Sequence, residues 1–334
     1  TGNADRPGGM MVTTPAFKKA RSRPMGSFNT YQSRARGLPE FDSYFPAVTI
    51  AEEMLTPGEG QVRGFVCVAG NPVLSTPNGR QMDEALDQLE FMVSIDFYLN
   101  ETSRHADIIL PPTGPLEHEQ YDIVFNMLAV RNLARFSDPV FAAPEGTRCD
   151  WDIVQGLTAR IMALKNPDAE PARKMPSPEQ ILDHGLKTGP YAEGFHEYNS
   201  GEPVKYDEPL SLDVLKRYPH GLDLGPMRES FPGYLFTADK NLHLTPPELV
   251  ADLSRAMAEL RGAEQGELML IGRRDLRTNN SWMHNSERLV KGKDRCALLV
   301  HPSDAERLGP ARGKQARSMS VPDTHLTCRR STPS

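Results

Sequence analysis

Two polar residues in the first half of the chain, Asn71 and Asp96, each come shortly after an apolar run. The amide of Asn71 offers a donor and an acceptor, and the carboxylate of Asp96 could accept two hydrogen bonds from the N–H edge of a guanine. Gly70 would let a backbone approach a ligand closely. The same residues also suit a purely structural role, because Gly70-Asn71-Pro72 is typical of a tight turn and Asp96 of a helix cap. The pattern alone favours the structural role.

The apolar runs around these residues predict three strands. They cover residues 65–69, 91–95 and 108–110, and each stops at a polar residue, glycine or proline. Between the first two runs, the spacing of Met82, Ala85, Leu86 and Leu89 predicts an amphipathic helix. A shorter helix is expected before the third run. This alternation predicts an α/β fold with a parallel sheet, in which ligands bind beyond the carboxyl ends of the strands.

Several spaced stretches of this region resemble one known family. GNPVLSTPN begins at Gly70, LEFMVSIDFYLNETSRHADIILPP begins at Leu89, and LE follows shortly after. Together they resemble the third domain of the molybdopterin oxidoreductases, whose catalytic subunits include formate dehydrogenases and nitrate reductases. The resemblance implies that this Rossmann-like domain binds one of two molybdopterin guanine dinucleotides, and it reverses the preference for a structural role. The implied cofactor-binding residues here are Gly70, Asn71, Pro72, Ile95 and Asp96.

Two further residues of the same domain are candidates. His118 stands among acidic residues, but it has no second His at i+4 and no Cys nearby, so the spacing favours a loop over a metal site. The resemblance implies a cofactor contact for His118. Asp150 is a plausible N-cap of a predicted helix, and the resemblance implies that it also contacts the guanine nucleotide. The two roles of Asp150 are compatible.

A second candidate region follows a strand predicted at residues 267–271. It is dense in hydrogen-bonding side chains, with three arginines and two asparagines, and such a loop could surround an oxygen-rich anion. A polar surface loop or a basic nucleic-acid loop are the other interpretations. The resemblance places this loop across the molybdopterin and implies contacts from Gly272, Arg273, Asn279, Asn280, Ser281, Trp282 and His284.

The expected organisation has five parts. Residues 1–44 form an extended entry, 45–165 the α/β dinucleotide-binding domain and 166–262 a Pro-rich surface connector with a terminal helix. Residues 263–318 form an incomplete β-barrel domain and 319–334 an irregular tail, which reads like out-of-frame sequence. The chain starts without Met and resembles a C-terminal fragment of a longer protein.

Composition narrows the class of protein. The 334 residues carry a formal charge of −6, which disfavours nucleic acid as a partner. Apolar runs are far shorter than the roughly 20 residues that span a bilayer, and no secretory signal is visible. The four cysteines form no Cys-x-x-Cys motif, so a reduced, cytoplasmic setting is expected.

The resemblance implies a catalytic subunit of a molybdenum- or tungsten-dependent oxidoreductase. Such an enzyme moves two electrons between a small substrate and the metal, and a 4Fe-4S cluster passes them to an electron-transfer partner. The cluster-binding cysteines and the metal-ligating residue belong to the half that would precede Thr1, so we expect no catalytic and no metal-binding residue here. The alternative is an inert fragment or a guanine-nucleotide-binding module.

Overall fold

The computed structural model describes residues 3–6, 9–10, 27–125, 129–168, 175–233, 235–262, 268, 271–272, 275–278, 283, 286–292, 297–309, 317–320 and 324–327. The chain divides into two compact units, Thr1–Leu242 and His243–Ser334. No helix among these residues is both long and apolar enough to cross a bilayer.

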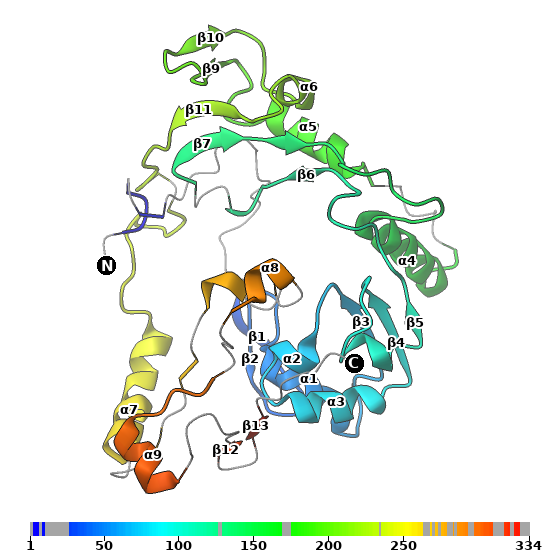
Figure 1. Ribbon diagram of the computed structural model, residues 1–334, viewed down its shortest axis with the longest axis vertical. Coiled ribbons are helices and arrows are strands. Elements are labelled where there is room, and N and C mark those ends of the chain that lie inside the picture. The colour runs from blue at the N-terminus through cyan, green and yellow to red at the C-terminus, as the bar shows by residue number, and fades with distance from the viewer. Residues whose placement is uncertain are drawn as a thin grey trace. The chain divides into compact units, whose positions relative to one another are not determined.

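The predicted parallel sheet is confirmed. Strands β3 (Gly64–Val68), β4 (Phe91–Ile95) and β5 (Ile108–Ile109) pair in parallel in the order β3-β4-β5. The connection from β3 to β4 carries α2 (Pro72–Ser75) and α3 (Gly79–Asp87), and the short 3-10 helix η2 (Ser103–His105) precedes β5. These elements reproduce the predicted order of strand, helix, strand, short helix and strand (Figure 1).

One face of this sheet is covered by two helices. The helix α1 (Ile50–Leu55), which follows η1 (Ala47–Thr49), contributes Ala51 and Met54, and α3 contributes Met82, Ala85 and Leu86. They pack with Cys67 of β3 and Met92 of β4 in one buried cluster. On the other face, Val66 and Val68 remain about half exposed, at 51% and 48%.

A second core lies where the sequence suggested a surface connector. Residues 178–226 form α5 (Pro178–Lys187), β9 (Phe195–Glu197), β10 (Val204–Tyr206), α6 (Leu212–Lys216) and β11 (Leu222–Pro226). β9 pairs with β10, and β11 pairs antiparallel with β7 (Arg131–Ala134). Leu186, Leu210, Leu215 and Leu222 are fully buried there. A surface connector is therefore a wrong description of this stretch. The sequence also predicts a short helix at residues 178–186 within the connector, and α5 confirms it.

The remaining elements of the first unit are short, apart from one helix. β1 (Phe28–Gln32) and β2 (Pro39–Phe41) form an antiparallel pair in the predicted extended entry, and β6 (Gln120–Tyr121) pairs antiparallel with β8 (Phe136–Ser137). The helix α4 (Asp150–Lys165) follows.

The second unit contains mainly helices among its described residues. They are α7 (Pro247–Gly262), η4 (Leu276–Thr278), α8 (Glu287–Val290) and α9 (Pro302–Leu308). The sequence predicts a short helix at residues 301–309 closed by glycine, and α9 ends at Gly309 in a left-handed conformation. The apolar run at residues 297–300 predicts a strand, but these residues form none. β12 (Arg317–Ser320) pairs with β13 (Thr324–Thr327) where the irregular tail was expected. The barrel falls largely on residues outside the described ones and stays a prediction.

Candidate functional site

The candidate site lies at the edge where the three parallel strands end. β3 runs into Gly70 and Asn71, and β4 runs directly into Asp96. After β5, Pro112 forms a parallel bridge with Arg148, and the amide of Thr113 donates to the Arg148 carbonyl at 3.1 Å. This bridge brings the start of α4, with Asp150, to the same edge. Asn71, Asp96 and Asp150, three of the four polar candidates of the first unit, thus lie at the edge where a parallel sheet offers its ligand site.

Asn71 is held by two residues of the loop that follows β4. Its Oδ1 accepts a hydrogen bond from the Thr102 hydroxyl at 2.7 Å, and its Nδ2 donates to Glu101 Oε2 at 2.9 Å. Thr102 is fully buried, and its hydroxyl also accepts from the backbone N–H of Val73 at 3.1 Å. The amide of Asn71 is therefore fixed in orientation by a contact across 31 positions of sequence.

Asp96 organises the same loop from its other end. Its Oδ1 accepts from the backbone N–H of Tyr98 at 2.9 Å, and its Oδ2 accepts from Asn100 Nδ2 at 3.0 Å. These bonds form a local turn, whereas the structural alternative from the sequence was a helix cap; the N-cap of the helix that follows is Thr102. Each carboxylate oxygen has a second lone pair, so Asp96 retains the capacity to accept two more N–H groups.

Asn100 joins these two groups into one network. Its Oδ1 accepts from the backbone N–H groups of Thr102 and Ser103, at 3.0 and 2.9 Å, while its Nδ2 reaches Asp96. A continuous chain of hydrogen bonds therefore runs from Asp96 through Asn100 and Thr102 to Asn71. Sequence analysis missed Asn100, Glu101 and Thr102. The signal was present in the Asn-x-Thr pattern, which is typical of side chains that bond to nearby backbone.

The backbone between β3 and Asn71 turns through an unusual residue. Ala69 has a φ of 49°, and its N–H still donates to the Ile95 carbonyl at 2.9 Å. A left-handed conformation is uncommon for a residue with a Cβ, and such strain often occurs at functional sites. The turn directs the chain toward the loop that holds Asn71.

Gly70 and Cys67 contact each other at this turn. A Cβ added at Gly70 would come no closer than 3.6 Å to another atom, the sulfur of Cys67, so packing within the chain does not require glycine there. Cys67 Sγ donates to the Gly70 carbonyl at 3.3 Å, and burial raises the pKa of this thiol. Ile95 is fully buried, and Pro72 is the first residue of α2, so neither offers a polar group to a ligand through its side chain.

Asp150 differs from its expected position by one residue. Cys149 occupies the cap of α4 and makes no side-chain capping bond, and Asp150 is the first residue within the helix. The N-cap role is therefore wrong for Asp150. A carboxylate in the first turn still interacts favourably with the helix dipole.

A buried hydroxyl at the same edge lacks a partner. Thr113 is 6% exposed, and its Oγ1 makes no hydrogen bond within the described residues. Buried polar groups are almost always paired, so a lone hydroxyl beside the strand ends is consistent with a ligand that is not part of the chain.

The other predicted residues are separate from this edge or cannot be placed. His118 precedes β6, and its Nδ1 donates to the carbonyl of Glu119 at 2.9 Å. Gly272 lies in the second unit. Six candidates lie outside the described residues, namely Arg273, Asn279, Asn280, Ser281, Trp282 and His284. Within the described residues, no group of three His, Cys, Asp or Glu side chains could hold a metal ion.

Comparisons with known proteins point to one family. Residues 9–160 match the family model described as molybdopterin oxidoreductase. The chain is 30% identical over 114 residues to the assimilatory nitrate reductase catalytic subunit of Bacillus subtilis, which is 34% of this chain and 15% of that protein. It is 29% identical over 129 residues to the dimethyl sulfoxide/trimethylamine N-oxide reductase of Cereibacter sphaeroides, which is 35% of this chain and 15% of that protein.

A longer match extends past the matched domain. The chain is 24% identical over 244 residues to a putative formate dehydrogenase of Bacillus subtilis, which is 64% of this chain and 24% of that protein. In each case the match covers less than a quarter of the relative's length.

Proposed function

The chain belongs to the molybdopterin oxidoreductase family, and from this premise we propose that the edge of the β3-β4-β5 sheet binds the nucleotide end of one molybdopterin guanine dinucleotide. Asp96 accepts from the N–H edge of the guanine, and Asn71 supplies a further donor or acceptor. The single observation that carries the proposal is the hydrogen-bond chain that joins these two side chains at the ends of neighbouring strands.

The residues at this edge fit such a group. Asp96 has two lone pairs without a partner in the described residues, and the buried Thr113 hydroxyl has no hydrogen-bond partner there. Asp150 stands at the start of α4, next to the end of β5, where its carboxylate can accept from N–H groups of a base. The residues therefore offer several acceptors for the N–H groups of a guanine.

The same proposal extends to the whole protein. The chain is the C-terminal part of a catalytic subunit, and in the intact protein the bound metal, molybdenum or tungsten, supplies two-electron chemistry on a small formate- or nitrate-like substrate. Names of the relatives support this substrate class, since they include a nitrate reductase and a putative formate dehydrogenase. The family resemblance implies that the 4Fe-4S cluster and the metal ligand are supplied by other parts of the intact protein.

The nucleotide role of Asp96 is tested with Asp96→Asn. This substitution keeps an oxygen for the Tyr98 N–H but removes the charge, so we expect guanosine diphosphate to bind about 10- to 100-fold more weakly, which is about 1.5–3 kcal/mol. Adenosine diphosphate should show no comparable loss. Calorimetric titration of both nucleotides measures the difference.

A matched control is available on another loop. Asp122 accepts backbone N–H bonds from Val124 and Phe125, at 2.9 and 2.8 Å, in a turn like that of Asp96. Asp122→Asn should leave both affinities unchanged. Equal losses for guanine and adenine in Asp96→Asn would show that Asp96 does not read the base. The alternative function, a guanine-nucleotide-binding module without catalytic activity, predicts the same titration result. The two functions are distinguished by whether the chain, together with the other parts of the intact protein, forms an active oxidoreductase.

A further inference from the structure

A second concave site lies on different elements of the first unit. A pocket of about 460 Å³ is formed by β6, β8 and the segments that flank them, and α6 closes one side with Lys216. Its volume is within the range of small-molecule sites, roughly 300–1,000 Å³. Neither the ends of β3 and β4 nor the network around Asn71 contributes to it.

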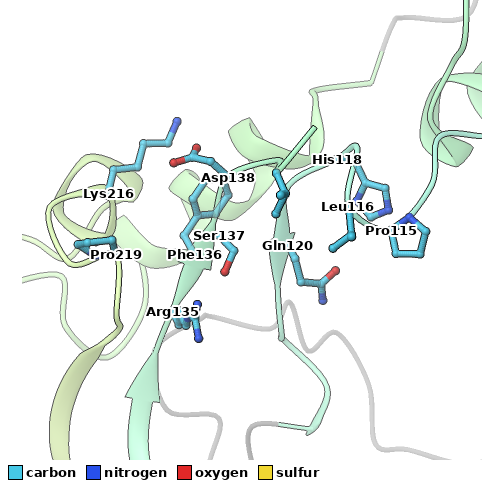
Figure 2. A pocket seen from close by; sticks show the side chains of 11 residues that line it. Pro115, Leu116, His118, Gln120, Arg135, Phe136, Ser137, Asp138, Lys216 and Pro219 are labelled. Atoms are coloured by element: carbon cyan, nitrogen blue, oxygen red, sulfur yellow. The ribbon is translucent and has the colours of Figure 1, made fainter. Parts of the chain in front are cut away.

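The strand register explains why polar groups line the floor of this pocket. Tyr121 pairs with Phe136, and both pack into the second core, where Phe136 is 4% exposed. Gln120 pairs with Ser137, so these two side chains share the opposite face of the strands. Figure 2 shows the Ser137 hydroxyl between the Arg135 guanidinium and the Gln120 amide.

The positive charge of Arg135 is not neutralised within the described part of the chain, where it makes no hydrogen bond or ion pair. Its neighbours differ in this respect. Arg131 donates to Asp223 at 2.7 Å, and Lys216 lies 3.6 Å from Glu179 and 5.1 Å from the centre of the Phe136 ring. A guanidinium presents a planar fork of donors that matches a carboxylate or a phosphate.

The remaining walls are apolar except for His118 and Asp138, whose carboxylate Figure 2 shows on the side of Lys216. Leu116 and Val140 are tied together because the Val140 N–H donates to the Leu116 carbonyl at 2.9 Å, and Pro115 and Pro219 lie on either side. Inorganic phosphate has no organic group that could contact these apolar walls. The donor set and the apolar walls together favour an anion that carries an organic group.

We propose that this pocket binds an organic oxyanion, a phosphate or carboxylate joined to an apolar or aromatic group. Arg135 is its main anchor, Ser137 and Gln120 complete the donor set, and Leu116 and Val140 cover the organic group. This site is additional to the dinucleotide edge, and it does not depend on the proposed function.

The test uses four probes on the 334-residue chain, with affinities measured by calorimetry. Phenyl phosphate and benzoate carry both features, inorganic phosphate has only the charge, and benzyl alcohol has only the ring. We expect phenyl phosphate or benzoate to bind more tightly than the other two, and the stronger of these identifies the preferred oxyanion. Arg135→Gln should weaken that binding about tenfold or more, because it removes a charge-assisted pair of hydrogen bonds.

Arg160→Gln is the matched control. Arg160 lies on the exposed side of α4, where it donates to the Gly156 carbonyl at 3.0 Å, and it loses the same charge without touching the pocket. Arg135→Lys keeps a charge without the planar fork and should lie between the wild type and Arg135→Gln. The proposal is overturned if no probe binds at about 10 mM, if Arg160→Gln weakens binding as much, or if Arg135→Gln changes nothing in a chain that remains folded by circular dichroism.

Discussion

At the scale of single residues, Ala69 shows how the end of β3 is shaped. Its left-handed φ of 49° turns the chain toward the loop around Thr102, while its N–H keeps the last bond to β4. An L-residue in this conformation costs roughly 1 kcal/mol, and glycine does not carry that cost. The strain is therefore stored one residue away from the proposed nucleotide contacts.

Ala69→Gly should raise the free energy of unfolding by up to about 1 kcal/mol, because glycine adopts the left-handed region freely. Urea denaturation measures the change. Ala142→Gly is the control, since Ala142 is exposed, irregular and without a positive φ, and it should give no gain. If Ala69→Gly gives no gain in the free energy of unfolding over Ala142→Gly, Ala69 carries no strain.

Glu40 is a second residue whose surroundings make a measurable prediction. Hydrogen bonds from the Ser27 hydroxyl, the Thr30 hydroxyl and N–H, and the Ser43 N–H lower the pKa of this buried carboxyl to about 2. The usual pKa of 4.5 applies in the unfolded chain. The stabilisation is therefore fully present above pH 4.5 and is lost as the pH falls toward 2.

We expect Glu40→Gln to flatten the dependence of stability on pH between 4.5 and 2, because the substituted side chain cannot take up the proton. Urea denaturation at pH 6, 4 and 3 provides the measurement. Glu145→Gln, in an exposed loop, should lose stability at acid pH as the wild type does. If Glu40→Gln and the wild type lose stability in parallel, other groups cause the acid sensitivity.

At the scale of elements, His105 connects η2 to α3. Its Nδ1 lies 2.7 Å from Asp87 Oδ1 and its Nε2 lies 2.7 Å from Asp83 Oδ1, with the side chain only 6% exposed. Burial acts to raise the pKa of Asp83, but hydrogen bonds from Arg104 and His105 outweigh it and lower that pKa. Because η2 begins next to Thr102, these contacts of His105 also fix Thr102, whose hydroxyl donates to Asn71.

His105→Ala should lower the free energy of unfolding by about 1–3 kcal/mol, because a buried imidazole loses its hydrogen bonds to two carboxylates. Faster hydrogen exchange at the Thr102 and Ser103 amides should accompany the loss. Arg80→Ala removes an exposed pair with Glu84 on the same α3 helix and should cost at most about 0.5 kcal/mol. If hydrogen exchange at the Thr102 amide is unchanged in His105→Ala, the contacts of His105 do not hold the loop around Thr102 in place.

The elements around the site were largely predictable, but their contacts were not. Apolar runs and helical spacing gave β3, α3 and β4, because these patterns depend on local sequence. The bond between Asn71 and Thr102 depends on how two connections meet after folding, and no local pattern encodes it. Asp150 was misplaced by one position, since Cys149 gives no capping signal and helix boundaries are the least certain feature of a sequence.

At the scale of the whole molecule, the second core is the largest departure from expectation. The stretch after Lys165 is rich in proline, and its strands β9 and β10 have only three residues each, too few to show a period. The buried leucines of this core come from α5, α6, β11 and the turn at Leu210. Apart from α5, each element is too short to be recognised alone, and only their packing together shows the core.

The two units differ in how they bury their apolar side chains, and substitution of leucines can measure this difference. Leu215 on α6 is fully buried in the second core, whereas Leu253 on α7 is 57% exposed. Leu215→Ala should lower the free energy of unfolding by about 2–5 kcal/mol, since it leaves a cavity in a packed cluster. Leu253→Ala should change it by no more than about 0.5 kcal/mol. Denaturation followed by tryptophan fluorescence tests both, with Trp151 on α4 reporting from the first unit. Similar costs for the two variants would mean that α7 is packed in solution against something that covers Leu253.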